Sequence, residues 1–261
     1  VNTLAQTLGL KFARIQFTPD LLPSDIIGTE IYNEKTGDFY TKKGPIFANI
    51  VLADEINRAP AKVQSALLEA MQEKQITIAS ETFKLDRPFI VLATQNPIEQ
   101  DGTYPLPEAQ QDRFLMKVKI EYPTKAEEKD MLKLLTSVSD FDSIQINEIL
   151  NKDKIEKIKQ IIREIHIDEK LMDYILDIVF KTRETNNYIA CGASPRASIA
   201  LVVSAKANAF LEGRDYVIPQ DIKRVIFDVL RHRMILTYEA EAEEKKAEDI
   251  ITDILEIVEL P

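Results

Sequence analysis

The chain has 261 residues, 45% of them hydrophobic and 29% charged, which is typical of a globular protein with a hydrophobic core. Its 43 acidic and 33 basic residues give a formal net charge of −10, which disfavours nucleic acid as a partner. A single cysteine, Cys191, excludes an internal disulfide. Because no apolar stretch is long enough to span a membrane and no signal-like segment begins the sequence, we expect a cytoplasmic protein.

The first half of the chain predicts an α/β arrangement. Residues 1–8 look like the end of a helix capped by Gly9, and apolar residues alternate along 11–17 as in a strand. Two short continuous apolar runs, 50–53 and 89–93, are typical of parallel strands covered on both faces. Between them, a crossover helix is predicted with Pro60 as its first residue, because the apolar residues that follow recur at helical spacing.

Two hairpins and one further strand are also expected in this half. One hairpin spans 29–45 with a turn at 35–37, and another spans 75–85 with its turn near Ser80. Residues 114–120 predict another strand, and Tyr122-Pro123 marks a boundary.

The second half is predicted to be helical almost throughout. Helix starts are expected at Thr124, Asp168, Ser194 and Pro219. Apolar spacing over 155–165 predicts a further helix, and the charged run 239–249 precedes a last amphipathic helix over 250–258. We therefore expect two domains, an α/β core over 1–121 and an all-α lid over 122–261.

Two adjacent carboxylates, Asp54 and Glu55, follow the buried run 50–53. Ligands bind at the carboxyl ends of strands in open α/β sheets. There an Asp can hold magnesium near ATP phosphates, and a second carboxylate can orient or activate the attacking water. The alternative is that Asp54 caps a turn and Glu55 is solvated, and the strand end alone does not decide between these interpretations.

Asn96 follows the second buried run in a similar way. An Asn before a Pro is also a common turn residue, and by itself this explanation is the better one. Polar ends on two neighbouring buried strands would, however, face one crevice, and this pairing favours a site.

Three segments resemble the MoxR family of AAA+ ATPases, and the resemblance covers nearly the whole chain. LADEINRAP resembles its Walker B segment, ATQNPIEQDGTYPLPEAQQDRF its sensor 1 region, and GASPRA, at 192–197, its sensor 2 motif. The resemblance implies an AAA+ P-loop NTPase core with a parallel sheet, followed by an all-α lid.

The resemblance also implies roles for individual residues, with ATP and Mg²⁺ as cofactors. Asp54 would bind the metal, Glu55 the attacking water, and Asn96 would act as sensor 1. Arg113 matches an arginine finger that reaches the ATP of the next subunit, with a surface salt bridge as its alternative. Arg196, at the start of a helix capped by Ser194 and Pro195, matches sensor 2, although an Arg in a first turn is more often solvated.

The family further implies partners and a task. We expect a homo-oligomer, by family a hexamer, in which Arg113 acts on the neighbouring subunit. The two hairpins look like the helix 2 and pre-sensor 1 insertions, which project toward a ring pore or partner. The implied activity is ATP-driven remodelling of a protein client, including metalloenzyme maturation, with a von Willebrand factor A domain protein as partner.

One motif of the family is absent from the sequence. No G-x-x-x-x-G-K-[ST] occurs, so we expect an upstream strand and P-loop to complete the site. The absence leaves open a non-hydrolysing interaction module, and the shared architecture leaves open a magnesium-chelatase-like or nucleic-acid ring motor. Arg58 is explained equally well by capping and by a subunit boundary, and His166, His232 and Cys191 are assigned no catalytic role.

Overall fold

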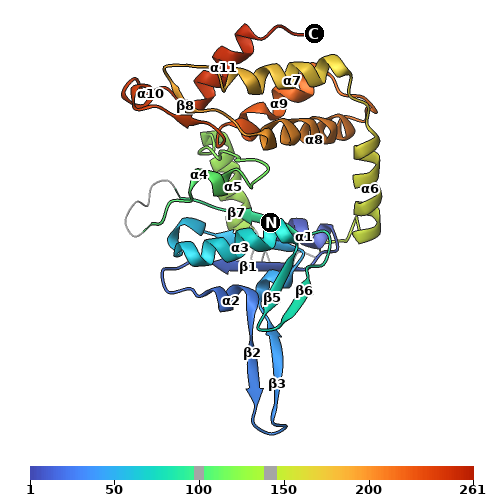
Figure 1. Cartoon of the computed structure of the whole chain (residues 1–261). Coiled ribbons are helices and arrows are strands. Elements are labelled where there is room, and N and C mark those ends of the chain that lie inside the picture. The colour runs from blue at the N-terminus through green and yellow to red at the C-terminus, as the bar shows by residue number, and fades with distance from the viewer. Residues whose placement is uncertain (97–102, 138–145) are drawn as a thin grey trace.

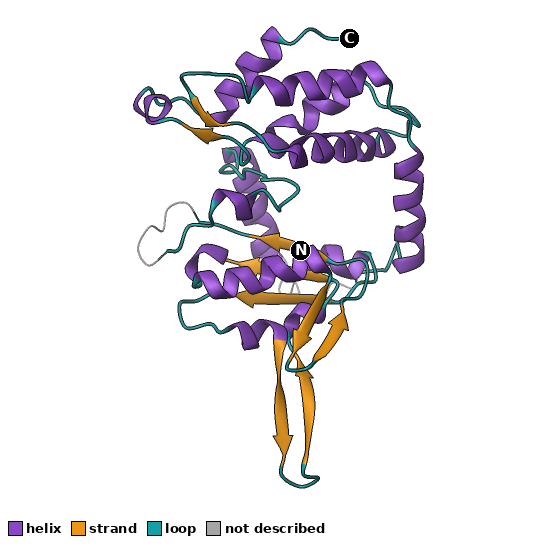
Figure 2. Ribbon diagram, in the orientation of Figure 1, coloured by secondary structure: helices purple, strands orange, loops and turns teal. Residues whose placement is uncertain are grey.

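Three parallel strands form the sheet at the centre of the N-terminal half in this computed structural model, which describes residues 1–96, 103–137 and 146–261 (Figure 2). The strands lie in the order β1-β4-β7 and span Phe12–Gln16, Ile50–Asp54 and Ile90–Ala93. Ile50 pairs with Phe12 on one side and with Ile90 on the other. The three predicted strands are therefore confirmed, and their carboxyl ends meet at one edge of the sheet.

Helix α3 (Ala61–Glu73) makes the crossover between β4 and β7. It buries one apolar face, which includes Val63, Leu67 and Leu68, against the sheet and begins one residue later than predicted because Pro60 is its N-cap. The short helices of this half are α1 (Asn2–Thr7), α2 (Pro23–Ile27), η1 (Pro45–Phe47), η2 (Ile56–Arg58) and α4 (Glu108–Gln111). Most of the sheet shares one hydrophobic cluster with α2, α3, η1 and η2, whereas Ala5 of α1 packs with Leu10 and Ile50 in a smaller cluster.

Both predicted hairpins are present on the side of the core away from the helical half (Figure 1). The longer one pairs β2 (Gly28–Asn33) with β3 (Asp38–Lys43), and the shorter one pairs β5 (Gln75–Ile78) with β6 (Glu81–Lys84). Lys43 connects them, because its Nζ lies 5.0 Å from the ring centre of Phe47 and 4.7 Å from that of Phe83. Such cation–π contacts fix the base of the long hairpin against the short one.

The C-terminal half is a helical lid with a hydrophobic cluster of its own. Its helices are α5 (Lys125–Ser137), α6 (Lys152–Glu164), α7 (Glu169–Lys181), α8 (Pro195–Leu211), α9 (Pro219–Leu230), α10 (Tyr238–Ala242) and α11 (Ala247–Ile257). The cluster buries Ile178, Leu201 and Ile226 completely. Side-chain caps at Asp168 and Ser194 accept backbone N–H groups, as their sequence positions predict.

The lid departs from the sequence predictions in two places, of which only the first is an exception to the all-α prediction. Strands β8 (Ile189–Cys191) and β9 (Ile235–Leu236) form a short antiparallel pair, and α10 begins the run that was predicted to be only charged surface. Thr237 caps α10, because its side chain accepts a hydrogen bond from the backbone N–H of Ala240. A Thr before a helix is a local sequence signal, but here it precedes a run of charged residues that was interpreted only as surface.

The predicted strand over 114–120 is wrong. Its backbone groups bond to the lid instead of to a neighbouring strand: Arg233 donates to the carbonyls of Phe114 and Leu115, and the N–H of Lys117 donates to the carbonyl of Asp228. Because these contacts come from residues far along the chain, local alternation could not reveal them. The segment connects the core to the lid, and the predicted division near residue 121 stays a prediction.

Within the described ranges, no helix is both long enough and apolar enough to cross a membrane.

Candidate active site

Asp54 and Glu55 lie at the carboxyl end of the middle strand, between polar residues of both neighbouring strands. Asp54 is the last residue of β4 and Glu55 directly follows it. Glu55 has φ of 55°, in the left-handed region, so the chain turns sharply as it leaves the sheet. Both residues are only half-buried, which leaves their carboxylates accessible from this edge.

Both oxygens of the Asp54 carboxylate accept hydrogen bonds. Thr94, directly after β7, donates its hydroxyl to Oδ1 at 2.5 Å. Arg14 of β1 donates to Oδ2 through Nε at 3.0 Å and through Nη2. The Thr94 hydrogen bond, followed by that of Arg14, holds the pKa of Asp54 below its usual value, so the carboxylate is charged at neutral pH.

Glu55 is held by groups from three directions. Gln16 of β1 donates its amide to Oε2 at 2.8 Å, and Arg58 donates to the same oxygen at 3.1 Å. The backbone N–H of Glu55 donates to the Thr94 hydroxyl at 2.9 Å. The Thr94 hydroxyl therefore links the two residues: it donates to the Asp54 carboxylate and accepts from the backbone N–H of Glu55.

Asn96 lies just beyond Thr94 and is half-buried in the same loop. Its position past the end of β7 agrees with the predicted pairing of two strand ends. The rest of the segment that suggested sensor 1, residues 97–102, lies outside the described residues.

Buried Gln64 fixes the loop that follows the two carboxylates. Its Nε2 lies 3.1 Å from the carbonyl oxygens of Ile56 and Ala59 and 3.0 Å from that of Tyr104. Since Gln64 belongs to α3, the crossover helix itself sets the path of the chain after Glu55.

Arg113 lies elsewhere, on the α3 side of the core. Its side chain donates to the carbonyl of Leu68 at 3.5 Å and lines an open depression with Glu69 and Glu73. The residue is exposed. The structure thus brings Asp54, Glu55 and Asn96 to one edge, and places Arg113 on another surface.

Arg196 lies where the lid meets the core. It is in the first turn of α8, where Ser194 accepts its backbone N–H at 3.1 Å, and its guanidinium contacts Asp112 at 3.2 Å. Asp112 also accepts hydrogen bonds from Ser194 and from Arg233. Arg196 is therefore an exposed branch of an ion-pair network whose buried member is Arg233.

His232, next to Arg233, is buried and makes a hydrogen bond with the carbonyl of Phe114 at 3.2 Å. Burial is the main cause that lowers the pKa of His232 to about 4, and the positive charge of Arg233 is the second cause. The ring is therefore neutral at physiological pH and, since its partner is a carbonyl, donates from Nε2. This agrees with a structural role.

The donor set at the strand ends fits a magnesium ion that arrives with a nucleotide. Among the described residues, no group of three or more His, Cys, Asp and Glu side chains is arranged to hold a metal ion by itself. Magnesium is commonly held by one or two carboxylates together with substrate phosphates and water. Asp54 supplies such a carboxylate, charged and accessible, so the residues present fit this mode of binding.

Comparison with known proteins agrees with this arrangement. Residues 1–116 match the model of the ATPase family associated with various cellular activities (AAA), and residues 182–254 match the AAA lid domain. The whole chain is 48% identical to Chaperone MoxR1 of Mycobacterium tuberculosis, covering 70% of that protein. The chain belongs to the MoxR family of AAA+ ATPases.

Two further relatives support the assignment. The whole chain is 47% identical to the protein YeaC of Bacillus subtilis, of which it covers 81%. A crystal structure from Cytophaga hutchinsonii, described as a "putative ATPase", is 53% identical over the whole chain and superposes with a TM-score of 0.92, with 81% of that protein covered. The predicted AAA+ fold is thus confirmed.

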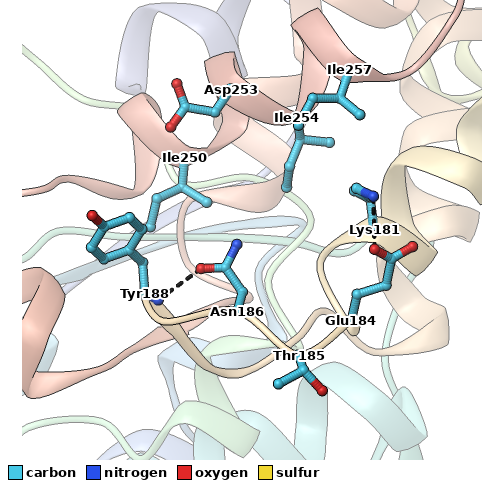
Figure 3. A pocket seen from close by; sticks show the side chains of 9 residues that line it. All are labelled: Lys181, Glu184, Thr185, Asn186, Tyr188, Ile250, Asp253, Ile254 and Ile257. Atoms are coloured by element: carbon cyan, nitrogen blue, oxygen red, sulfur yellow. Dashed lines mark hydrogen bonds and ion pairs between the residues drawn. The ribbon is translucent and has the colours of Figure 1, made fainter.

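A separate cavity of about 210 Å³ lies in the lid between the end of α7 and α11 (Figure 3). Several of its polar groups are already paired: Lys181 with Glu184 at 2.7 Å, and the Asn186 side chain with the backbone N–H of Tyr188 at 2.7 Å. The cavity is lined only by lid residues, none of which belongs to the predicted site.

Sequence reasoning missed several residues of these networks, namely Arg14, Gln16, Gln64, Thr94, Asp112 and Arg233. A signal existed for two of them, because Arg14 and Gln16 form the polar face of an alternating strand near its carboxyl end. Thr94 offered a third such signal, because it directly follows an apolar run, as Asp54 does. For Asp112 and Arg233 there was no local signal, since they meet across the core–lid junction.

Proposed function

We propose that the chain carries the hydrolytic side of an ATP-driven MoxR-type motor, with Asp54 and Glu55 at its centre. The observation that carries the proposal is the convergence of Asp54, Glu55 and Thr94 at the carboxyl ends of adjacent parallel strands. This is the edge where open α/β sheets bind ligands. Membership in an ATPase family gives independent support.

Each residue has a role that its position supports. Asp54 would hold Mg²⁺, directly or through water, and the bound metal would supply positive charge beside the phosphates. Glu55 would orient the attacking water and accept its proton as the water oxygen bonds to the γ-phosphorus and the bond between that phosphorus and the leaving ADP breaks. Asn96 is proposed to position the same water, and Arg196 to contact the nucleotide from the first turn of α8.

The phosphate-binding half of the site is proposed to adjoin the open edge of β7. Within the described residues, β7 pairs only with β4. A largely apolar groove of about 480 Å³ runs beside it, lined by Val91, Leu92, Phe114 and Met116 among others. A further strand that carries a phosphate-binding loop would cover this groove and satisfy the free backbone groups of β7.

Arg113 is proposed to act on the ATP of a neighbouring copy in a ring, by family a hexamer. Its exposed position on the α3 side supports action in trans, because it lies on a different surface from Asp54. Remodelling of a protein client, including metalloenzyme maturation with a von Willebrand factor A domain partner, is proposed from the family. The acidic balance of the chain disfavours a nucleic-acid substrate.

The direct test is ATP turnover by the full-length protein and by Glu55→Gln. We expect the variant to bind ATP and to lose at least about 100-fold in kcat, because a positioned base contributes roughly that much. Glu259→Gln makes the same chemical change at an exposed residue after α11 and should keep wild-type turnover. Absent turnover in both wild type and Glu55→Gln would favour a non-hydrolysing interaction module, whereas equal, measurable turnover in both would show that Glu55 is not the base.

Action in trans is tested by mixing two inactive variants, Glu55→Gln and Arg113→Ala. In a mixed ring, an Arg113→Ala subunit with an intact Glu55 can receive Arg113 from a Glu55→Gln neighbour. With equal amounts, about a quarter of the interfaces in a ring would regain both groups. Recovery of ATP turnover on mixing supports the ring. A mixture that is no more active than the two variants measured separately argues that Arg113 acts within its own subunit or not at all.

A further inference from the structure

The carboxylate of Asp54 is already neutralised by a cation of the chain itself. Arg14 places two guanidinium nitrogens on Oδ2, the oxygen that Thr94 leaves open. The Asp54 side chain is 20% exposed, whereas that of Arg14 is 61% exposed. Arg14 is therefore the member of the pair that can move away into solvent while Asp54 stays in place.

The same strand also restrains Glu55. Arg14 donates to the amide oxygen of Gln16 at 3.3 Å, and Gln16 donates its amide hydrogen to Glu55. Arg14 and Gln16 are two apart in β1, so their side chains leave the same face of the sheet. Gln16 pairs in register with Asp54, which brings this face directly beside both carboxylates. One strand thus holds both groups in the metal-free state.

We propose that Arg14 is a positioning residue that occupies the Asp54 carboxylate in the resting protein and is displaced when magnesium enters with a nucleotide; this rests on the proposed function. A metal ion and a two-nitrogen guanidinium contact compete for the lone pairs of Oδ2. The two cations also repel each other at such short range. Arg14 therefore raises the metal concentration at which the site fills, and keeps Asp54 and Glu55 in place while it is empty.

The size of the effect follows from the exposure of the pair. An exposed ion pair of this kind changes an equilibrium constant by about two- to five-fold. Removal of Arg14 should tighten metal binding by about this factor and should not weaken it. The low pKa of Asp54 has Thr94 as its first cause, so the carboxylate is expected to remain charged in the variant.

The experiment measures Mn²⁺ binding, as a paramagnetic substitute for Mg²⁺, to the full-length protein with the ATP analogue AMP-PNP. Free Mn²⁺ is followed by electron paramagnetic resonance in wild type, Arg14→Ala and Arg58→Ala. Arg58 is the matched control, because it is a cation on Glu55 that leaves the Arg14 contact with Asp54 intact. We expect a Kd for Mn²⁺ about two- to five-fold lower in Arg14→Ala and a smaller change in Arg58→Ala.

An unchanged or higher Kd in Arg14→Ala would overturn the proposal, since Arg14 would then be neutral or helpful to the metal. An equal decrease in Arg58→Ala would also overturn it, because a general effect of positive charge would explain both. Arg14→Lys keeps the charge but loses the two-nitrogen contact, and is expected to tighten Mn²⁺ binding by less than the alanine variant. If Arg14→Ala does not fold, Mn²⁺ binding to Arg14→Lys still tests the proposal.

Failure of this inference and failure of the proposed function give different results. If wild type binds Mn²⁺ with AMP-PNP and hydrolyses ATP, but Arg14→Ala shows no tighter binding, only the role of Arg14 is wrong. If wild type neither binds Mn²⁺ with the analogue nor hydrolyses ATP, the proposed function fails and the role of Arg14 fails with it.

Discussion

Two ion-pair networks in this molecule use the same residue types in opposite ways. At the sheet edge, Arg14 contacts Asp54 with 61% and 20% of the two side chains exposed. At the junction of core and lid, Arg233 contacts Asp112 with 2% and 14% of the two side chains exposed. Arg233 also donates to the carbonyls of Phe114, Leu115 and Val229, so it is fully enclosed by acceptors.

The difference in burial predicts a difference in function. A buried charge that loses its partner is costly, whereas an exposed pair exchanges its partner for water at little cost. The junction network is therefore suited to hold the lid on the core permanently. The sheet-edge network is suited to open when another cation arrives.

The largest effect is expected at the junction. Arg233→Ala removes the buried donor to Asp112, which keeps Ser194 and Arg196, and one donor from each of three carbonyls, and should lower the free energy of unfolding by about 3 to 5 kcal/mol. Urea denaturation measures the change. Arg224→Ala, which removes an exposed pair with Glu212, is the control and should cost less than about 1 kcal/mol. Similar losses in both variants would remove the distinction between the two networks.

A pH-dependent effect is expected from the neighbouring His232. Its pKa is about 4 in the folded state against about 6.5 when unfolded, so between these values the unfolded chain binds a proton that the folded chain does not. Stability should therefore fall as the pH falls from about 6.5 to 4, by up to about 3 kcal/mol. His232→Gln should lose this part of the slope in urea denaturation at several pH values. His166→Gln, at an exposed histidine, is the control, and an unchanged slope in His232→Gln would contradict the assignment.

A smaller effect on stability is expected at Arg196, which shares Asp112 with Arg233. Arg196→Ala removes only the exposed branch and should cost less than about 1 kcal/mol. Under the proposed function it should nevertheless weaken ATP binding, measured by calorimetry on the full-length protein. Loss of stability as large as that of Arg233→Ala would show that the two arginines form one structural unit.

The smallest effect on stability is expected at Arg14. Arg14→Ala should change the free energy of unfolding by less than about 0.5 kcal/mol at low salt. The difference should disappear in about 1 M NaCl, where screening extends to only about 3 Å. A loss above about 2 kcal/mol, a size typical of buried pairs, would mean that the sheet-edge network is as structural as the junction.

The sequence was sufficient wherever a local pattern carried the information. Apolar runs located β4 and β7, helical spacing located α3, and the caps at Asp168 and Ser194 located two lid helices. It was insufficient where partners come from distant parts of the chain. The segment over 114–120 alternates like a strand but takes its backbone partners from residues 228–233.

The candidate site shows the same limit. Asp54, Glu55 and Asn96 could be proposed because each follows a recognisable strand. The polar face of the first strand pointed to Arg14 but not to its partner Asp54, because that contact depends on β1 lying next to β4, which only the strand order reveals. The roles of Arg113 and Arg196 came from family resemblance, and remain predictions that the experiments above test.

The left-handed backbone of Glu55 has a consequence for protein engineering. Residues with a side chain in this conformation cost about 1 to 2 kcal/mol, a penalty that glycine avoids. A search for stabilising substitutions that considers only thermal stability would therefore select Glu55→Gly. Under the proposed function it would select an inactive protein, so improvement of this motor for heat resistance should leave position 55 fixed.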